Sequence, residues 1–383
     1  PDHNVECQET FKRGIPLLSR AEILAEICKQ KSALVVSGTH GKTTTSSMLA
    51  LVLRSADMKP SFIIGGDVNE VGTGAAWDDG SIFVVEGDES DGSFLLLPRD
   101  YAVVTNVEAD HLEHHGGYEA LEEAFEKFVE ETRGPVVVGI DDDGGKKLAS
   151  SQNVVSLGMD SSAEWRITEL EESWTGVSFN LKDPNNHELL VKLPIPGLHN
   201  AKNAACAAVA GIVAGADPNA VVEALERFGG VARRFEHRGQ IAGVTFVDDY
   251  AHLPTEVSAT ISAANTGNWS RLISVFQPHR YSRTEALWRT FQDSFQGTDL
   301  LFVTDVYASG EKSRPGISGA LIADAVSLSN PTFEVRYVPH RSDLIEALAS
   351  ELREGDCCLT MGAGDLTSLP DEIQNMMREL NER

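Results

Sequence analysis

The sequence predicts an α/β protein built from two domains, each with a mostly parallel sheet. Three observations support this prediction. Apolar, β-branched runs alternate with amphipathic helical stretches in the first part of the chain, and the same alternation returns after residue 240. The strand runs are continuously apolar, which is typical of strands covered on both faces. A length of 383 residues also exceeds the ~150 residues of a typical single domain.

In the first series, each predicted strand is a short run rich in Val, Ile or Phe, and each predicted helix places apolar residues three or four positions apart. Because helices separate many of the strands, the sheet is expected to be mostly parallel. The predicted strands are residues 32–38, 62–66, 81–88, 101–107 and 135–140, and the predicted helices are 21–30, 43–56 and 118–132.

The pattern changes between residues 160 and 192. Three short strand runs, at 167–173, 176–182 and 187–195, are joined by turn residues with no helix between them. This arrangement predicts a small antiparallel ribbon. Two helices are expected to follow it, an Ala-rich one over 199–216 and a second over 218–228.

Gly229 and Gly230 mark the predicted boundary between the domains. Beyond them a second series of strands and helices predicts a doubly wound, Rossmann-like domain. Its predicted strands are 244–249, 271–277, 300–306, 334–339 and 357–362, and its predicted helices are 254–265, 283–296, 316–328, 341–353 and 370–381. We therefore expect a linker over residues 1–15, a central domain over 16–230 and a C-terminal domain over 231–383.

The charge balance narrows the class of partner. Acidic residues number 58 against 32 basic ones, which leaves a formal net charge of −26. Such a surface repels nucleic acid and anionic membranes, so we expect neither as a partner. The sequence has no apolar run near the ~20 residues of a membrane span, and no secretory signal is expected. Five scattered cysteines without a C-x-x-C pair are typical of a reducing compartment. We expect a cytoplasmic protein, either a monomer or a weak homodimer.

A phosphate-binding loop follows the first predicted strand. Backbone N–H groups at the start of the next helix can surround an anion, the Lys42 ammonium can reach the β- and γ-phosphates, and the Thr43 hydroxyl can bind Mg²⁺. The strict P-loop pattern requires glycine at position 36, which is Val36, so only the shorter Gly-x-x-Gly-Lys-Thr pattern remains. The loop predicts a P-loop ATPase-like domain that binds ATP through Gly38, Thr39, His40, Gly41, Lys42, Thr43 and Thr44.

Several stretches in order resemble the Mur ligase family, the enzymes that add amino acids to the peptidoglycan precursor. They are the loop Ser-Gly-Thr-His-Gly-Lys-Thr-Thr-Thr, residues 84–97 and 103–117, and residues 246–264 and 275–284. The resemblance covers nearly the whole chain and is nearest to the branch that adds L-alanine. It implies an ATP-dependent ligase with Mg²⁺ as cofactor. Such an enzyme converts the carboxylate of UDP-N-acetylmuramate to an acyl phosphate, which the amine of L-alanine then attacks.

Enzymes of this family begin with a domain that binds the UDP part of the substrate. Here the phosphate loop is already reached at residue 38. The resemblance therefore implies that this domain is absent from the chain, and that residues 1–15 are what remains of the linker behind it.

Candidate metal ligands follow two predicted strands. Glu86 ends a buried strand that can lie next to the phosphate-loop strand, where Glu86 and Thr43 would hold Mg²⁺ together. By resemblance, His111 ligates a second Mg²⁺ near the acyl phosphate. The spacing of the histidines over 111–115 matches neither of two common zinc motifs, H-E-x-x-H and H-x-x-E-H. The acidic residues Asp88, Glu89 and Asp91 are as readily explained by a solvated loop.

The remaining nucleotide contacts are expected from three places in the chain. By resemblance, His199, Asn200 and Asn203 recognise adenine, although Asn200 could instead simply cap its helix. Asp249 ends a predicted strand, where open α/β sheets bind ligands, and is expected to bind the ribose. Arg234 begins the C-terminal domain and could reach over the phosphates.

A cluster of polar residues in two loops of the last domain is expected to bind the amino acid. Two guanidinium groups three residues apart can hold the carboxylate of L-alanine. A histidine could accept the proton of the incoming ammonium, either His252 or His279. The predicted substrate-binding residues are Tyr250, His252, His279, Arg280 and Arg283, and the predicted catalytic residues are Lys42, His111, His252 and Arg280. Each of the five predicted substrate-binding residues could alternatively be an ordinary surface residue.

Three other functions remain open at this point. A related ligase that recycles a whole tripeptide shares the phosphate loop, but usually has tyrosine where this chain has Ser90. Without its UDP-binding domain, the chain could bind ATP without ligation. A P-loop kinase or GTPase is disfavoured by the second domain and its His-Arg-Tyr-Ser-Arg loop.

Overall fold

The computed structural model describes residues 4–68, 72–109 and 116–381. The chain divides into two compact units. The first comprises residues 1–169, 179–191 and 202–227, and the second comprises 170–178, 192–201 and 228–383. Both are of the α/β class, so the predicted fold class is confirmed.

The first sheet has ten strands in the order β10-β9-β8-β7-β6-β5-β1-β4-β2-β3. An interior strand, β1 (Ser32–Ser37), pairs in parallel with β4 (Ile82–Glu86) and β5 (Tyr101–Val104). The remaining strands are β2 (Ser61–Val68), β3 (Thr73–Ala76), β6 (Val136–Gly139), β7 (Val154–Gly158), β8 (Trp165–Ser173), β9 (Gly176–Lys182) and β10 (Glu188–Leu193). The predicted ribbon corresponds to β8–β10. Because only two residues separate β8 from β9, this pair must be antiparallel.

Helices of the first unit begin and end at residues that suit those positions. For example, α1 (Val5–Arg13) starts after Asn4, whose side chain accepts two backbone N–H bonds, and α1 has no buried residue. The others are α2 (Arg20–Cys28), α3 (Lys42–Ser55), α5 (Tyr118–Glu130), α6 (Asp143–Leu148), α7 (Leu198–Val213) and α8 (Pro218–Glu226), with a 3₁₀ turn η1 at Ser93–Leu96. The rings of Phe94, Phe125 and Phe128 pack together in the core.

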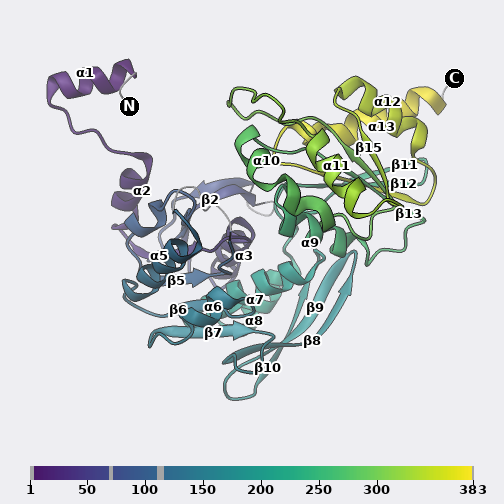
Figure 1. Cartoon of the computed structure of the whole chain (residues 1–383). Helices are drawn as coiled ribbons and strands as arrows, with labels where there is room; N and C mark the ends of the chain where they lie inside the picture. Colours follow the sequence, from purple (N-terminus) through teal and green to yellow (C-terminus); the bar gives the residue numbers. More distant parts are fainter. Residues whose placement is uncertain (1–3, 69–71, 110–115, 382–383) are drawn as a thin grey trace. The chain divides into compact units, whose positions relative to one another are not determined.

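The second sheet has six strands in the order β11-β12-β16-β13-β14-β15. Figure 1 labels β11, β12, β13 and β15 of this sheet. The strands are β11 (Glu236–Ile241), β12 (Val244–Asp249), β13 (Arg271–Phe276), β14 (Leu300–Val303), β15 (Glu334–Tyr337) and β16 (Asp356–Met361). All neighbouring pairs are parallel except β11 with β12. Two separate cores lie on the two faces of this sheet: Val247 and Phe276 belong to one, and Phe246 and Val275 to the other. This alternation is the doubly wound arrangement that the sequence predicts.

The helices of the second unit follow its strands. One core takes residues from α9 (Pro254–Ala264) and α11 (Ala320–Ser329), and the other from α12 (Arg341–Glu351) and α13 (Leu369–Asn381). A single helix predicted over 283–296 is instead a short α10 (Tyr281–Leu287) followed by a 3₁₀ helix, η2 (Trp288–Asp293). A further 3₁₀ turn, η3 (Asp365–Ser368), precedes α13. Among the described residues, no helix is both long and apolar enough to cross a bilayer.

Candidate functional site

The phosphate loop connects β1 to α3 through a tight backbone turn. Gly38 has φ 133° and Gly41 has φ 81°, in the region that favours glycine. A Cβ atom at Gly41 would lie 2.2 Å from Oδ1 of Asn203, and one at Gly38 would lie 2.1 Å from Oγ1 of Thr105. Backbone conformation and close approach therefore both require glycine at these two positions of the loop.

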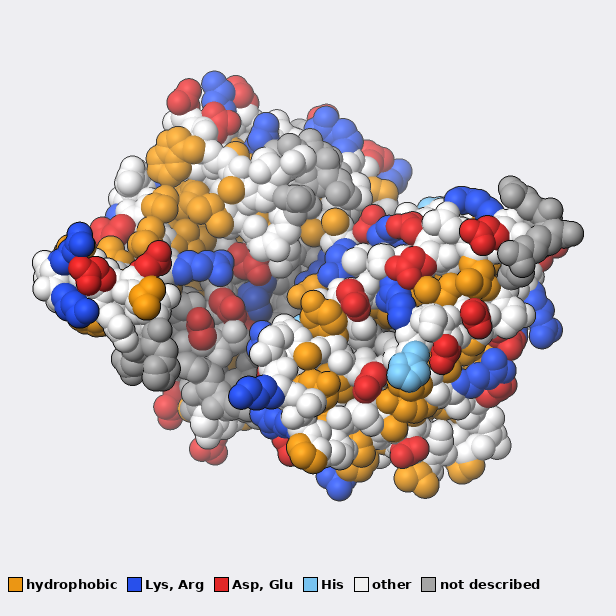
Figure 2. Space-filling model, turned by 90° about the horizontal axis from the view of Figure 1, so that it is seen from above, with side chains coloured by type: hydrophobic (Ala, Val, Ile, Leu, Met, Phe, Trp, Pro, Cys, Tyr) orange, Lys and Arg blue, Asp and Glu red, His pale blue; other side chains and the backbone are white. Residues whose placement is uncertain are grey.

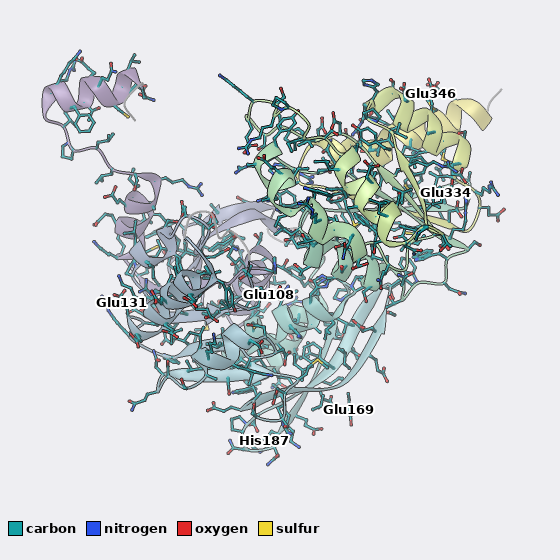
Figure 3. The ribbon with its side chains drawn as sticks, viewed as in Figure 1. Glu108, Glu131, Glu169, His187, Glu334 and Glu346 are labelled. Carbon is teal, nitrogen blue, oxygen red and sulfur yellow. The ribbon has the colours of Figure 1, made fainter. Side chains whose placement is uncertain are left out.

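Residues after β5 hold this loop in place. The side chain of Asn106 accepts the His40 N–H at 2.9 Å and donates to the His40 carbonyl at 3.1 Å. Next in the chain, the Glu108 N–H donates to Oγ1 of Thr39 at 2.9 Å. The carboxylate of Glu108, which is labelled in Figure 3, lies 3.6 Å from Nε2 of His40, and its interaction with His40 lowers the pKa of Glu108. The sequence analysis includes this stretch in the resemblance but assigns no role to Asn106 or Glu108.

Lys42 occupies a largely buried position within the loop. Its ammonium donates to the carbonyl groups of Gly38 at 2.8 Å and Thr39 at 3.2 Å, and lies 2.7 Å from Oε2 of Glu89. The Glu89 side chain is only 1% exposed. Burial raises its pKa to about 7, although the charge on Lys42 acts in the opposite direction. The solvated-loop interpretation is therefore wrong for Glu89, while Asp88 and Asp91 are exposed as that interpretation expects.

Thr43 and Glu86 lie together at the carboxyl ends of neighbouring strands. The register of β1 and β4 pairs Val36 with Glu86, which brings the Glu86 carboxylate beside the phosphate loop. Oγ1 of Thr43 donates to Oε1 of Glu86 at 3.0 Å, and the Gly65 N–H donates to Oε2 at 2.9 Å. A hydroxyl and a carboxylate are hard oxygen ligands of the kind that Mg²⁺ prefers.

In the part of the chain that the structure describes, Thr43 and Glu86 do not belong to a larger group of metal ligands. Within the described ranges, no cluster of three His, Cys, Asp or Glu side chains is arranged to hold a metal ion. Phosphate oxygens and water could supply remaining ligands of a cation at Thr43 and Glu86. The other predicted ligand, His111, lies outside the described residues.

The residues predicted to recognise adenine lie in the first turns of α7. Asn203 is 6% exposed and stands against Gly41, as described above. The Asn200 amide is also buried and donates to the Pro196 carbonyl at 2.7 Å. Because α7 begins at Leu198, Asn200 lies inside the first turn, so its interpretation as the N-cap is wrong. The ring of His199 packs close to Gly197.

In the second unit, Asp249 ends β12 and is 6% exposed. Its two carboxylate oxygens accept the N–H groups of Phe235 and Ala251, each at 2.7 Å. Burial raises the pKa of Asp249 to about 6, and the nearby Arg234 opposes that shift. The Arg234 guanidinium also lies 4.8 Å from the centre of the Tyr250 ring.

Four aromatic side chains run in a series through the predicted amino-acid-binding residues. The ring centres of Tyr250 and His252 are 5.4 Å apart, and those of His252 and His279 are 5.8 Å apart. Tyr307 then stacks on His279 at 5.8 Å with an interplanar angle of 11°. The structure thus brings together predicted residues from two loops, and adds Tyr307, which the sequence analysis does not identify.

The two histidines of this series differ in their hydrogen bonds. Nδ1 of His252 lies 3.1 Å from the Tyr250 carbonyl and 3.3 Å from Oε2 of Glu256, and burial lowers its pKa. Nδ1 of His279 lies 3.1 Å from Nη1 of Arg283. Because a guanidinium can only donate, this nitrogen of His279 must accept and is unprotonated. Burial, followed by His252 and the arginines, lowers the pKa of His279 to about 4.

The surface shows no single dominant sign of charge on the visible face. Figure 2 shows acidic and basic side chains interspersed there, despite the net charge of −26. The basic groups of the candidate site act locally, since Lys42 and Arg283 are paired within hydrogen-bond distance of named partners. An anionic substrate would therefore be bound by specific groups rather than by the general field.

Two domain families match the chain. The Mur ligase middle domain matches residues 36–211, and the Mur ligase glutamate ligase domain matches residues 233–364. These matches, together with the phosphate loop and the Thr43–Glu86 pair, define the class of protein as a Mur ligase.

Curated relatives narrow the class further. The UDP-N-acetylmuramate–L-alanine ligase of Desulforamulus reducens is 41% identical over 98% of this chain and 82% of its own length. The same-named enzyme of Kineococcus radiotolerans is 43% identical over 98% of this chain and 81% of its own. The solved UDP-N-acetylmuramate–alanine ligase of Thermotoga maritima covers the whole chain with a TM-score of 0.82, 27% identity and 83% of its own chain matched.

The chain therefore belongs to the UDP-N-acetylmuramate–L-alanine ligase family. The predicted enzyme class, an ATP-dependent ligase that forms ADP, is confirmed. A MurF ligase from Thermotoga maritima, solved with ADP, shares the fold at 19% identity and a TM-score of 0.71. The expected absence of an N-terminal domain stays a prediction.

Proposed function

We propose that this chain joins L-alanine to the carboxylate of UDP-N-acetylmuramate through an acyl phosphate, with ATP as the phosphoryl donor and Mg²⁺ as cofactor. The observation that carries the proposal is the grouping of Lys42, Thr43 and Glu86 at one phosphate loop, where an ammonium, a hydroxyl and a carboxylate meet. These are the groups that phosphoryl transfer to a carboxylate needs, because negative charge accumulates on the phosphate oxygens.

In the first step, the substrate carboxylate attacks the γ-phosphorus, and ADP leaves. The loop N–H groups bind the phosphates, and Lys42 exchanges its contact with Glu89 for a γ-phosphate oxygen. Thr43 and Glu86 would hold Mg²⁺, which when bound neutralises charge on the β- and γ-phosphates. By family resemblance, His111 holds a second Mg²⁺, and adenine contacts His199, Asn200 and Asn203. Asp249 would bind the ribose, and Arg234 would contact the phosphates.

In the second step, the amine of L-alanine attacks the acyl phosphate and inorganic phosphate leaves. We assign the amino-acid carboxylate to Arg280 and Arg283, which are close in sequence at the start of α10. We assign the proton acceptor to His252 rather than His279, because Arg283 donates to Nδ1 of His279, whereas a Glu256 carboxylate oxygen lies 3.3 Å from Nδ1 of His252 and would stabilise its protonated ring. Tyr250 packs against His252 and supports that ring.

The tripeptide-recycling alternative is less well supported. A murein peptide ligase from Psychrobacter arcticus shares the fold with a TM-score of 0.69, but at 21% identity that likeness extends to the fold alone. The relatives from Desulforamulus reducens and Kineococcus radiotolerans, at 41% and 43% identity, carry the alanine ligase name.

The test is an assay of the amide product by mass spectrometry. The full chain would be incubated with Mg²⁺-ATP, UDP-N-acetylmuramate and either L-alanine or the tripeptide, with and without an added N-terminal domain from a relative. We expect product with L-alanine and none with Lys42→Ala, while the tripeptide gives little. ATP binding without any amide product, even with the added domain, would contradict the proposed function and favour a binding module.

A separate variant tests the role of His111. If this residue binds a second Mg²⁺, His111→Ala should lower the ligation rate and shift the Mg²⁺ dependence to higher concentrations. An unchanged rate across a Mg²⁺ titration would remove His111 from the metal site.

A further inference from the structure

The start of α10 is held by a distant loop instead of its own N-cap residue. The N-cap position is occupied by Arg280, which has φ 69°. Arginine carries no hydrogen-bond acceptor in its side chain, so it cannot satisfy the N–H groups of the first helical turn. A backbone with φ 69° and ψ 138° is also unfavourable for a non-glycine residue. Both features would normally disfavour arginine at this position.

Backbone bonds to residue 307 are one of two sets of contacts that restrain Arg280. The Arg280 N–H donates to the Tyr307 carbonyl at 2.8 Å, and the Tyr307 N–H donates to the Pro278 carbonyl at 2.8 Å. His279 and Tyr307 form an isolated parallel β-bridge, and their rings stack. A strained residue persists only where several neighbouring contacts determine its conformation, and such residues cluster at functional sites.

Glu311 supplies the missing helix cap from the same loop. Its Oε2 accepts the Ser282 N–H at 2.9 Å, and its Oε1 accepts the Ser282 hydroxyl at 2.5 Å. These bonds favour the charged carboxylate, so they lower the pKa of Glu311, and Arg314 contributes to the same shift. A carboxylate at the first turn of a helix is also favourable for the helix dipole.

We infer that Glu311 is a positioning residue for amino-acid recognition: by capping α10 through Ser282, it helps to keep Arg280 in its positive-φ conformation. The direction of the Arg280 side chain follows from that backbone, and Arg283 lies one turn further along the same short helix. Loss of the cap lets residue 280 relax to an ordinary φ, which redirects its guanidinium. This inference rests on the proposed function, because it assumes that the two arginines bind the carboxylate of L-alanine.

The test compares Glu311→Ala with Glu285→Ala in the full chain. Glu285 on α10 forms an ion pair with Arg314, which lies in the same loop as Glu311. This ion pair does not involve Ser282. At saturating ATP and UDP-N-acetylmuramate, Glu311→Ala should raise the KM for L-alanine about tenfold, the range of one lost well-placed contact. The KM for ATP should change less than about twofold, and Glu285→Ala should leave both constants within that range.

A double-mutant cycle separates positioning from general destabilisation. If Glu311 acts through Arg280, then adding Glu311→Ala to Arg280→Ala should not raise the KM for L-alanine further. Glu311→Gln keeps an oxygen acceptor for Ser282, so its KM for L-alanine should lie between those of the wild type and Glu311→Ala. This variant keeps the inference testable if Glu311→Ala folds poorly.

The outcomes separate this inference from the function on which it rests. Wild-type ligation with an unchanged KM for L-alanine in Glu311→Ala overturns the inference alone. So does a parallel rise in the KM for ATP, or full additivity in the cycle. If the unmutated chain makes no product under any condition, the proposed function fails instead.

Discussion

The ammonium of Lys42 lies 2.7 Å from a carboxylate oxygen of Glu89, whose side chain is 1% exposed. A carboxylate buried this deeply is stable only beside a cation or in its protonated form. Lys42 is also the residue expected to bind the γ-phosphate. Any phosphate that binds there must therefore compete with Glu89 for the lysine.

This pair predicts an unusual pH dependence of stability. Burial raises the pKa of Glu89 from 4.5 to about 7, so between these values the folded protein binds more protons at this site than the unfolded chain. The free energy of unfolding should therefore fall as pH rises through this window, by up to about 3 kcal/mol. Urea unfolding of the wild type and Glu89→Gln from pH 4.5 to 8 would measure the difference. Identical pH profiles for the wild type and Glu89→Gln would contradict this prediction. Asp91→Asn, at an exposed position, serves as the control.

The phosphate loop predicts a specific cost for alanine at position 41. Gly41 and Gly316 have nearly the same φ, 81° and 80°, but a Cβ at Gly41 would meet Asn203 at 2.2 Å, whereas Gly316 has open space. Both Gly→Ala variants should lose about 1 to 2 kcal/mol from the backbone conformation. Only Gly41→Ala should also lose ATP binding, measured by calorimetry. Normal ATP affinity in Gly41→Ala would show that the contact with Asn203 can be relieved.

The contact between Thr43 and Glu86 predicts the Mg²⁺ dependence of ligation. Thr43→Val preserves the shape of the side chain and removes the hydroxyl that bonds Glu86 at 3.0 Å. We expect the Mg²⁺ concentration for half-maximal activity to rise about tenfold or more, whereas Thr43→Ser should stay near the wild type. Ser47→Ala, which removes a bond to the helix backbone in α3, is the control. An unchanged Mg²⁺ dependence in Thr43→Val would exclude this hydroxyl as a ligand.

The contact between Arg283 and His279 predicts a shift in histidine titration. A nearby cation disfavours the protonated ring, and burial, His252 and Arg283 together hold the pKa of His279 at about 4. Arg283→Gln should therefore raise this pKa toward its ordinary value of 6.5. Ring proton chemical shifts followed by NMR from pH 3 to 8 would measure it, with exposed Arg289→Gln as control. A pKa that stays at about 4 in Arg283→Gln would assign the whole shift to burial and His252.

The secondary structure was largely predictable where local pattern is strong. The buried strands β1, β4, β12 and β13 are continuous apolar runs, and β16 begins one residue before the predicted 357–362. Three strands, β3, β7 and β11, were missed, and two of them, β3 and β11, have a weak local signal. For example, β3 contains two alanines and a glycine, and β11 reads Glu-His-Arg-Gly-Gln-Ile. Such segments become strands because a neighbouring strand offers hydrogen bonds at the sheet edge.

The sequence by itself determined most of the strands and helices, the phosphate loop and the positions of the arginines at 280 and 283, because each depends on residues close together in the chain. Only the tertiary structure decided the partners of these groups. Lys42 and Glu89 meet because β1 and β4 are parallel neighbours whose following loops share one edge of the sheet. Glu311 reaches Ser282 because β13 and β14 are also parallel neighbours, so the segments that follow them start at the same edge of their sheet. A local pattern cannot distinguish a buried carboxylate from a solvated one, since burial depends on what the rest of the fold packs around it.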